Sequence, residues 1–327
     1  MFIQDSIQLF RPSREKIKWK VPALCCNDWA AIRLLKICSK LSGISAFDIA
    51  YGAPNCAWSG GHHTVVNQTL SEAQLIDYVR TYKNSGAICA FTLSRLNVPK
   101  ENLADQYCNL ILDIIEEYGG EVIVYDDILA AYVRKAHPKI KTIASISKAK
   151  CCYKTGFEGF KDETAYYYSL LDKYDIVNVR ADYALDNEQL DKLSDVSDHI
   201  EILVNDICKP GCTSVYAHLR AIEEWSDTGR HDFSQGCYYA DTLSILENRL
   251  EQNQFISEPR ISELVYLGFT RFKLAGRNIP PQKFLDMLAR YIFEPTGTIF
   301  FIVNEIVNEF RTMENSGNGL AQCQLPC

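Results

Sequence analysis

The feature that most constrains the fold of this chain is an eightfold alternation of short apolar runs with longer segments of helical spacing. Parallel strands joined by crossover helices produce this alternation, because each strand is followed by the helix that covers it. The runs expected to form strands are Val21–Cys25, Phe47–Tyr51, Ile88–Leu93, Glu121–Tyr125, Thr142–Ile146, Asp175–Val179, Glu201–Asn205 and Arg271–Leu274.

Helical patterns fill the intervals between these runs, and several begin at a capping residue such as Ser71. Eight units over about 275 residues match a closed (β/α)8 TIM-like barrel of class α/β, in which no strand edge is left exposed. An open doubly wound sheet is the main alternative, but it favours a glycine-rich phosphate loop after an early strand, and this chain has none there. The expected helices are Asp28–Leu41, Ser71–Lys83, Glu101–Glu117, Ile128–Ala136, Glu163–Lys173, Asn187–Leu193, Ser214–Glu224 and Pro281–Ile292.

The chain is expected to be one barrel domain, residues 1–312, followed by a flexible tail, residues 313–327. The connection between the seventh and eighth strands, about residues 206–270, exceeds a normal βα loop and must hold extra structure, including an inserted cysteine-bearing segment. Thr298–Phe310 has helical apolar spacing, which favours a helix that caps the barrel over one that binds a partner.

Composition excludes several classes of protein. With 47% hydrophobic and 23% charged residues, the chain has the apolar content of a globular core. A net charge of -7 and the absence of basic, aromatic-rich tracts disfavour a nucleic-acid partner. No apolar run reaches the roughly 18 residues of a membrane span, and no signal peptide is visible, so we expect a cytoplasmic protein with no membrane association.

Cysteine is abundant, with 13 in the chain, and in a reducing compartment this odd count favours free thiols or metal ligands over disulfides. The sharpest local motif is Cys208 and Cys212, where Pro210 and Gly211 permit a tight turn between two thiolates. Cys237 lies in the same connection, and Cys56 follows the second strand. Four thiolates suit a tetrahedral zinc ion or a [4Fe–4S] cluster, and spacing alone does not choose between them or exclude a site without metal.

Other polar residues follow the predicted strands, on the face where barrel enzymes place their chemistry. Arg95, Arg180 and Arg277 could bind a carboxylate or phosphate of a substrate, or could form structural ion pairs. Asp126 and Asp127 could supply a general base, or an N-cap for the next helix. His62, with His63 beside it, could serve as an acid or base, or belong to a polar loop.

Four short stretches also resemble a known family. The stretch FDIAYGAPNCAWSGG resembles the loop that carries the first cluster cysteine in the UbiU and UbiV proteins of oxygen-independent ubiquinone biosynthesis, which belong to the collagenase-like peptidases, the U-thirty-two family. Three further stretches, EILVNDICKPGC, GCYYAD and GFTRFKLAGRN, are similar to motifs of that family in the same order. This resemblance implies a [4Fe–4S] cluster held by Cys56, Cys208, Cys212 and Cys237. Outside these stretches the chain carries no specific match.

The resemblance implies an iron–sulfur enzyme that modifies a small or peptide-derived substrate by oxygen-independent, hydroxylation-type redox chemistry. Two alternatives remain open: an accessory subunit for electron transfer or assembly with a partner barrel, and a peptidase-type hydrolase without metal. Lys209-Pro210-Gly211 replaces the Ser-Gly-Arg of the peptidase signature, and Ala275 replaces the acidic residue of the eighth-strand motif. Both differences disfavour a collagen-type peptidase.

Overall fold

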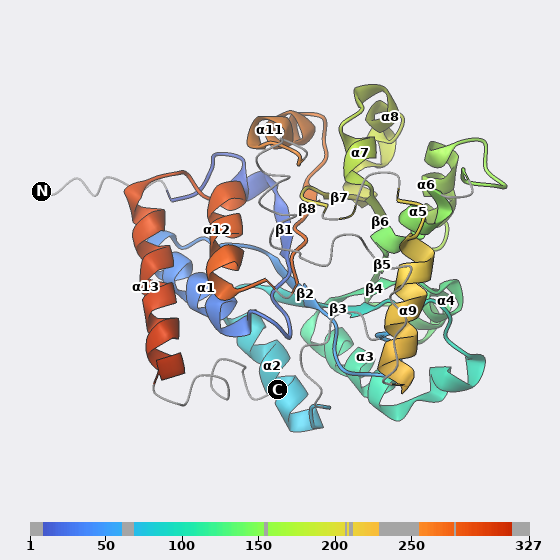
Figure 1. The fold of residues 1–327 in the computed structure, drawn as a ribbon, viewed down its shortest axis with the longest axis horizontal. Coiled ribbons are helices and arrows are strands. Elements are labelled where there is room, and N and C mark those ends of the chain that lie inside the picture. The colour runs from blue at the N-terminus through green and yellow to red at the C-terminus, as the bar shows by residue number, and fades with distance from the viewer. Residues whose placement is uncertain are drawn as a thin grey trace, which may run out of the picture.

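Eight parallel strands close into a barrel in which each strand pairs with its neighbours in sequence and β8 pairs with β1 (Figure 1). The structure is a computed structural model, and it describes residues 9–60, 69–153, 156–206, 208, 212–228, 255–277 and 279–315. The predicted (β/α)8 barrel is therefore confirmed. The strands are β1 (Lys18–Val21), β2 (Ile49–Gly52), β3 (Ile88–Leu93), β4 (Glu121–Val124), β5 (Lys141–Ala144), β6 (Ile176–Val179), β7 (Ile200–Leu203) and β8 (Arg271–Lys273).

Helices surround the sheet, and the apolar side chains between sheet and helices form the main core. Trp19 of β1, for example, points outward and packs its ring 5.6 Å from Phe272 and 6.2 Å from Tyr291. The helices are α1 (Asp28–Ser42), α2 (Glu72–Asn84), α3 (Gln106–Tyr118), α4 (Asp127–Ala136), α5 (Ile146–Tyr153), α6 (Glu163–Leu171), α7 (Ala181–Ala184), α8 (Asn187–Asp191), α9 (Val215–Thr228), α11 (Glu258–Tyr266), α12 (Pro281–Ile292) and α13 (Gly297–Asn315), with 3₁₀ turns η1 (Arg14–Lys16), η2 (Lys100–Ala104) and η3 (Ser194–His199).

The first strand lies earlier than predicted, at Lys18–Val21 in place of 21–25. No apolar run marks this strand, because its inward residue is a lysine, Lys20. The barrel can bury this side chain because carboxylates of other strands balance its charge. The residues after the strand turn instead, and Cys25 takes a left-handed conformation with φ 62°. Most other strand ends differ from the prediction by one or two residues, and Ile88–Leu93 matches it.

Some helices also differ from the expectation. The segment predicted as Glu101–Glu117 divides into η2 and α3 because the Asp105 side chain accepts a hydrogen bond from the Cys108 amide and begins a new helix. Helix α5 was not predicted, and α9 and α11 are the described structure within the long connection between β7 and β8.

The C-terminal helix α13 packs against α1 and α12, which confirms a capping helix (Figure 1). It continues to Asn315, past residue 313, where the tail was expected to begin. None of the described helices combines the length and the apolarity needed to cross a membrane.

Candidate functional site

Four charged side chains inside the barrel form a balanced set, here called the charged layer: Lys20, Glu121, Glu201 and Arg271. Lys20 Nζ lies 2.9 Å from Glu121 Oε2 and 2.6 Å from Glu201 Oε2, and Arg271 Nη2 donates to Glu121 Oε1 at 2.7 Å. All four side chains are at most 5% exposed. Two cations and two carboxylates therefore neutralise one another away from water.

The charged layer controls the ionisation of Glu121. Burial alone would raise the pKa of Glu121, but Lys20 and Arg271 outweigh burial and lower the pKa to about 2. Glu121 is thus charged at neutral pH, and its charge belongs to the internal pairing of the layer.

Lys273 lies next to this layer on the inner wall, at the C-terminal end of β8. It is in register with Lys20 on one side and with Leu203 on the other. Its Nζ lies 4.3 Å from the centroid of the Tyr51 ring, and the Tyr51 hydroxyl donates to the Leu274 carbonyl at 2.7 Å. The nitrogen makes no hydrogen bond or ion pair with any described residue, although the side chain is buried.

The electrostatic surroundings of Lys273 disfavour its ammonium form. The pKa of Lys273 is lowered to about 7 in all: burial lowers it most, Glu201 opposes burial, and the positive charges of Lys20, Arg277 and Lys150 add to the lowering. Glu201 is already shared by Lys20 and, at 3.8 Å, by Arg271. A large fraction of the Lys273 amine is therefore neutral at physiological pH, and a neutral amine is a base and a nucleophile.

Polar groups without partners lie on the same inner wall. Thr92 and Ser94 lie two and four residues after Ala90 and so share its face of β3 and of the segment that follows, and Asn178 shares the face of Ile176 on β6; Ala90 and Ile176 belong to the apolar cluster inside the barrel. The oxygens Thr92 Oγ1, Ser94 Oγ and Asn178 Oδ1 are buried without a hydrogen-bond partner among the described residues. Buried polar atoms are normally paired, so such a group of them indicates a place for a ligand.

We call this end of the barrel interior the mouth, and it comprises Tyr51, Thr92, Ser94, Asn178, Lys273 and Arg277. Arg277 follows β8, and its Cζ lies 5.7 Å from the same Tyr51 ring that Lys273 approaches. A fixed cation and a titratable amine therefore both lie close to one aromatic ring.

The three predicted arginines are not gathered in one place. Arg180 is held by Glu163, with both contacts at 2.9 Å, and Arg95 forms an ion pair with Asp227 of α9. Among the three, the structure places Arg277 beside Lys273. The substrate-binding roles of Arg95 and Arg180 stay predictions. Both guanidinium groups form ion pairs within the protein, which was the alternative to substrate binding.

The two predicted aspartates have separate surroundings. Asp126 is the N-cap of α4 and accepts from the Leu129 amide at 2.8 Å. Asp127 pairs with Lys148 and Lys173, each at 2.6 Å; burial raises its pKa, but these two lysines outweigh burial and lower the pKa to about 2. A carboxylate with so low a pKa is a weak base. Their catalytic roles stay predictions, and His62 and His63 lie outside the described residues.

The predicted metal ligands are engaged in different local contacts. The thiol of Cys56 is hydrogen-bonded to that of Cys108, and this contact, together with burial, raises the pKa of Cys108. Cys208 is hydrogen-bonded to Lys150, and its amide donates to Asp206 at 2.9 Å.

Among the residues that the structure describes, no group of three or more His, Cys, Asp or Glu could hold a metal ion. The described thiols therefore do not by themselves form a cluster site. Cys237, the fourth ligand that the family resemblance implies, lies outside the described residues, as do the tail cysteines. The [4Fe–4S] cluster, and zinc as its alternative, stay predictions.

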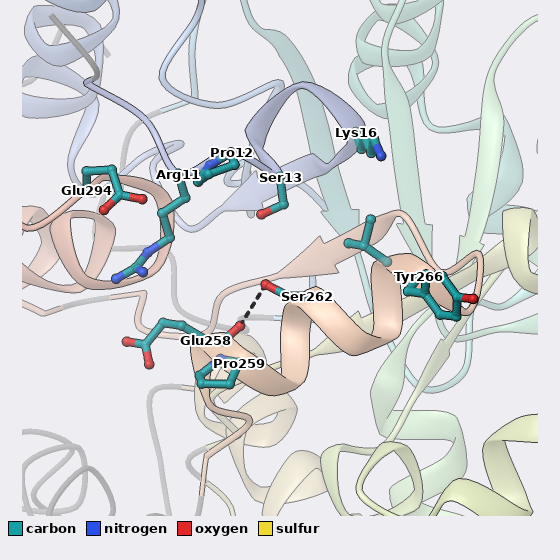
Figure 2. A pocket seen from close by; sticks show the side chains of 10 residues that line it. Arg11, Pro12, Ser13, Lys16, Glu258, Pro259, Ser262, Tyr266 and Glu294 are labelled. Carbon is teal, nitrogen blue, oxygen red and sulfur yellow. Dashed lines mark hydrogen bonds between the residues drawn. The ribbon is translucent and has the colours of Figure 1, made fainter.

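Pockets on the outer surface lie away from the mouth. One of about 550 Å³ lies between the N-terminal segment and α11, and Figure 2 shows Arg11, Ser13 and Lys16 facing Glu258 and Tyr266 across it. The Ser262 hydroxyl there donates to the Glu258 carbonyl at 3.3 Å, which is a contact within the helix. Two further pockets lie between α1 and α13 and beside α8 and α11. Exposed charged side chains are among the residues that line these pockets, and no buried reactive group is among them.

Sequence analysis missed Lys273. Its signal was present in the stretch RFKL, where a lysine interrupts an apolar strand at an inward position. A lysine in such a position must either meet a carboxylate or lose its charge. Lys20 meets carboxylates, whereas the pKa of Lys273 is lowered, and only the fold shows which lysine follows which course.

Comparison with known proteins gives limited similarity. No model of a known protein family matches the chain, and no curated protein matches it. Among solved structures, that of the U32 peptidase Mk0906 is similar, with a TM-score of 0.46 and 12% identity, over 81% of this chain and 94% of that one. The closed barrel rests on the strand pairing described above, independently of this similarity.

Proposed function

We propose that this chain is an enzyme that binds a small anionic organic substrate in the mouth of its barrel and acts on it through the amine of Lys273. The observation that carries the proposal is the placement of Lys273 Nζ, buried, 4.3 Å from the Tyr51 ring and without a polar partner among the described residues. Among the described residues, no hydrogen bond or ion pair uses this amine, whereas Lys20 beside it forms ion pairs with two carboxylates.

Three further features support the proposal. Barrel enzymes carry their chemistry at the C-terminal ends of the strands, where Lys273 lies. Its pKa of about 7 is well matched to proton transfer or nucleophilic attack near neutral pH. Arg277 supplies a permanent positive charge for an anionic group, and the buried oxygens of Thr92 and Ser94 supply hydrogen-bonding capacity.

The amine can be tested without knowledge of the substrate. Trinitrobenzenesulfonate, an anionic reagent specific for neutral amines, is applied to the folded protein over pH 5.5–10, and modified lysines are quantified by peptide mass spectrometry. We expect modification of Lys273 with a midpoint near pH 7, well below the pKa of about 10.4 of a model lysine, and exposed Lys16 serves as the control for reagent access. Protection of Lys273 by small carboxylates or phosphate esters, lost in Arg277→Gln, would identify the anion site.

The proposal fails if Lys273 stays unmodified while Lys16 reacts, or if the midpoint for Lys273 lies near the model lysine pKa of about 10.4. It also fails if no small anion slows the modification of Lys273.

The second candidate is the oxygen-independent iron–sulfur protein that the family resemblance implies. The observation that favours it is that Cys208 and Cys212 both lie in the connection after β7, on the same end of the barrel as the mouth. Iron, sulfide and zinc are measured after anaerobic purification of the protein, Cys208→Ala and, as a matched control, the buried Cys38→Ala. Iron and sulfide lost in Cys208→Ala but retained in Cys38→Ala would support a cluster. Metal-free protein in all three preparations would exclude it.

A further inference from the structure

We infer that the substrate is a small oxo acid whose carbonyl carbon becomes bound to Lys273 Nζ as an imine, while Arg277 holds its carboxylate. This inference rests on the proposed function and narrows it to a substrate class and a covalent step. It follows from the contacts of the amine, from the neighbouring cation and from the polar wall of the mouth.

An imine-forming lysine needs a free lone pair, and the groups that face Lys273 leave it one. From β2 it meets the face of the Tyr51 ring, whose hydroxyl is committed to the Leu274 carbonyl. From β1 and β7 it meets Lys20 and Glu201, which are paired with each other at 2.6 Å.

The remaining charged groups near the amine are cations. Arg277 lies after β8, and Lys150 lies on α5, where it donates to Asp206 at 2.7 Å. Among the described residues, Glu201 is the carboxylate that acts on the amine, and it forms no ion pair with Lys273, since its Oε2 lies against Lys20 and its Oε1 has no hydrogen-bond partner. The positive charges of Lys20, Arg277 and Lys150 disfavour an ammonium at this position. A substrate that carries an electrophilic carbon is the partner that a neutral amine in this position suits.

Arg277, the cation beside Lys273, indicates which second group the substrate carries. The Arg277 guanidinium and the Lys273 amine both approach the Tyr51 ring, so a carboxylate on Arg277 would place an adjacent carbonyl carbon at the amine only in a short molecule. Guanidinium binds a carboxylate through two parallel hydrogen bonds, which fixes its orientation. The buried oxygens of Thr92, Ser94 and Asn178 can bind a hydroxyl group or the departing water.

The covalent step balances without any further reagent. The Nζ lone pair adds to the carbonyl carbon while a proton of the amine passes to the carbonyl oxygen, which gives a carbinolamine. Loss of that hydroxyl together with the second amine proton releases one water and forms the carbon–nitrogen double bond. No atom changes its net oxidation state in a way that requires an oxidant or a reductant.

Borohydride trapping tests the inference directly. The protein is incubated at pH 7 with glyoxylate, pyruvate, 2-oxobutyrate or acetoacetate, then reduced with sodium borohydride and analysed by intact and peptide mass spectrometry. We expect a permanent adduct on Lys273 whose added mass is that of the acid less one oxygen atom, with at least one of these acids. Lactate, which lacks the carbonyl, should give none.

Variants separate the amine from the anion site. Lys273→Met should lose the adduct, whereas Lys16→Met should keep it. Arg277→Gln should trap oxo acids at least tenfold less than the parent protein but trap neutral acetaldehyde equally well. Since Lys273→Met removes a buried charge, we expect it to fold, and circular dichroism verifies this.

Absence of an adduct with all four oxo acids would overturn the inference. If Lys273 nevertheless reacts with trinitrobenzenesulfonate at a midpoint near pH 7, the proposed function stands and only the imine is rejected. Equal trapping on Lys16 and Lys273, or oxo-acid trapping unchanged in Arg277→Gln, would also overturn it. Failure of both the trapping and the trinitrobenzenesulfonate reaction would reject the proposed function itself.

Discussion

The charged layer and the mouth occupy the same barrel interior but treat their charges in opposite ways. In the charged layer, Lys20 is shared between Glu121 and Glu201 and is fully buried. In the mouth, Lys273 lies in register beside Lys20 but has an aromatic ring where Lys20 has carboxylates. The comparison teaches that a buried charge with matched partners maintains the fold, whereas a buried amine without one is available for chemistry.

The largest effect is expected from breaking the charged layer. Lys20→Met leaves Glu121 and Glu201 with Arg271 alone, and removal of one member of a buried ion network costs about 3–5 kcal/mol of unfolding free energy. Urea unfolding at pH 7 measures the change. Lys18→Met, an exposed lysine of the same strand, is the matched control and should change stability by less than about 0.5 kcal/mol. Equal effects of the two substitutions would show that the layer does not maintain the fold.

Removal of the lysine of the mouth should have the opposite effect on stability: it should raise the free energy of unfolding. The folded-state pKa of Lys273, about 7, lies below the 10.5 of a free lysine, so the unfolded chain binds more protons between these values and the parent protein gains stability as pH rises through this interval. Lys273→Met removes this penalty and should stabilise the protein by on the order of 2–4 kcal/mol at pH 7 and below.

Unfolding measured at pH 6, 7.5 and 9 distinguishes this effect from ordinary repacking. The advantage of Lys273→Met should shrink as the pH rises, because the parent protein then loses its penalty. A variant that is less stable than the parent at every pH would contradict the difference between the two lysines.

A smaller effect should separate Arg180 from Arg277. Arg180→Met leaves the Glu163 carboxylate without its two 2.9 Å hydrogen bonds, which should cost about 1–3 kcal/mol. Arg277→Met should cost less than Arg180→Met, because Arg277 is half-buried whereas Arg180 is buried. Thermal unfolding of both variants measures this, and a larger loss in Arg277→Met would assign Arg277 to the fold.

The smallest effect concerns the pair Arg95 and Asp227, which joins the segment after β3 to α9. Because the side chains are 21% and 44% exposed, we expect a coupling of about 0.5 kcal/mol at low salt. A double-mutant cycle with Arg95→Gln and Asp227→Asn measures it, and 1 M salt should abolish it. A coupling above 2 kcal/mol that persists in 1 M salt would show that this pair stabilises the fold as the charged layer does.

Much of the fold could be predicted because alternation of apolar runs and amphipathic segments is a local property. Ile88–Leu93 and Pro281–Ile292 were predicted at their observed bounds, since apolar or capping residues mark both ends. The strand Lys18–Val21 was misplaced because its inward lysine is neutralised by residues about 100 and 180 positions away, a pairing that no local pattern shows.

The candidate site was predicted in part. That polar side chains gather at the strand ends follows from the barrel, and Arg277 was identified on that basis. Arg180 and Asp126 were identified by the same argument but engage Glu163 and the backbone of α4, because the same polar groups that suit a ligand also suit a nearby partner.

The sequence by itself determined that this chain forms a (β/α)8 barrel, since hydrophobic periodicity dictates which faces must be buried. Only the tertiary structure decided which of two inward lysines meets carboxylates. Coulomb energy and desolvation depend on distances between strands that are remote in sequence, so the charge of Lys20 and the neutrality of the Lys273 amine are properties of the closed barrel.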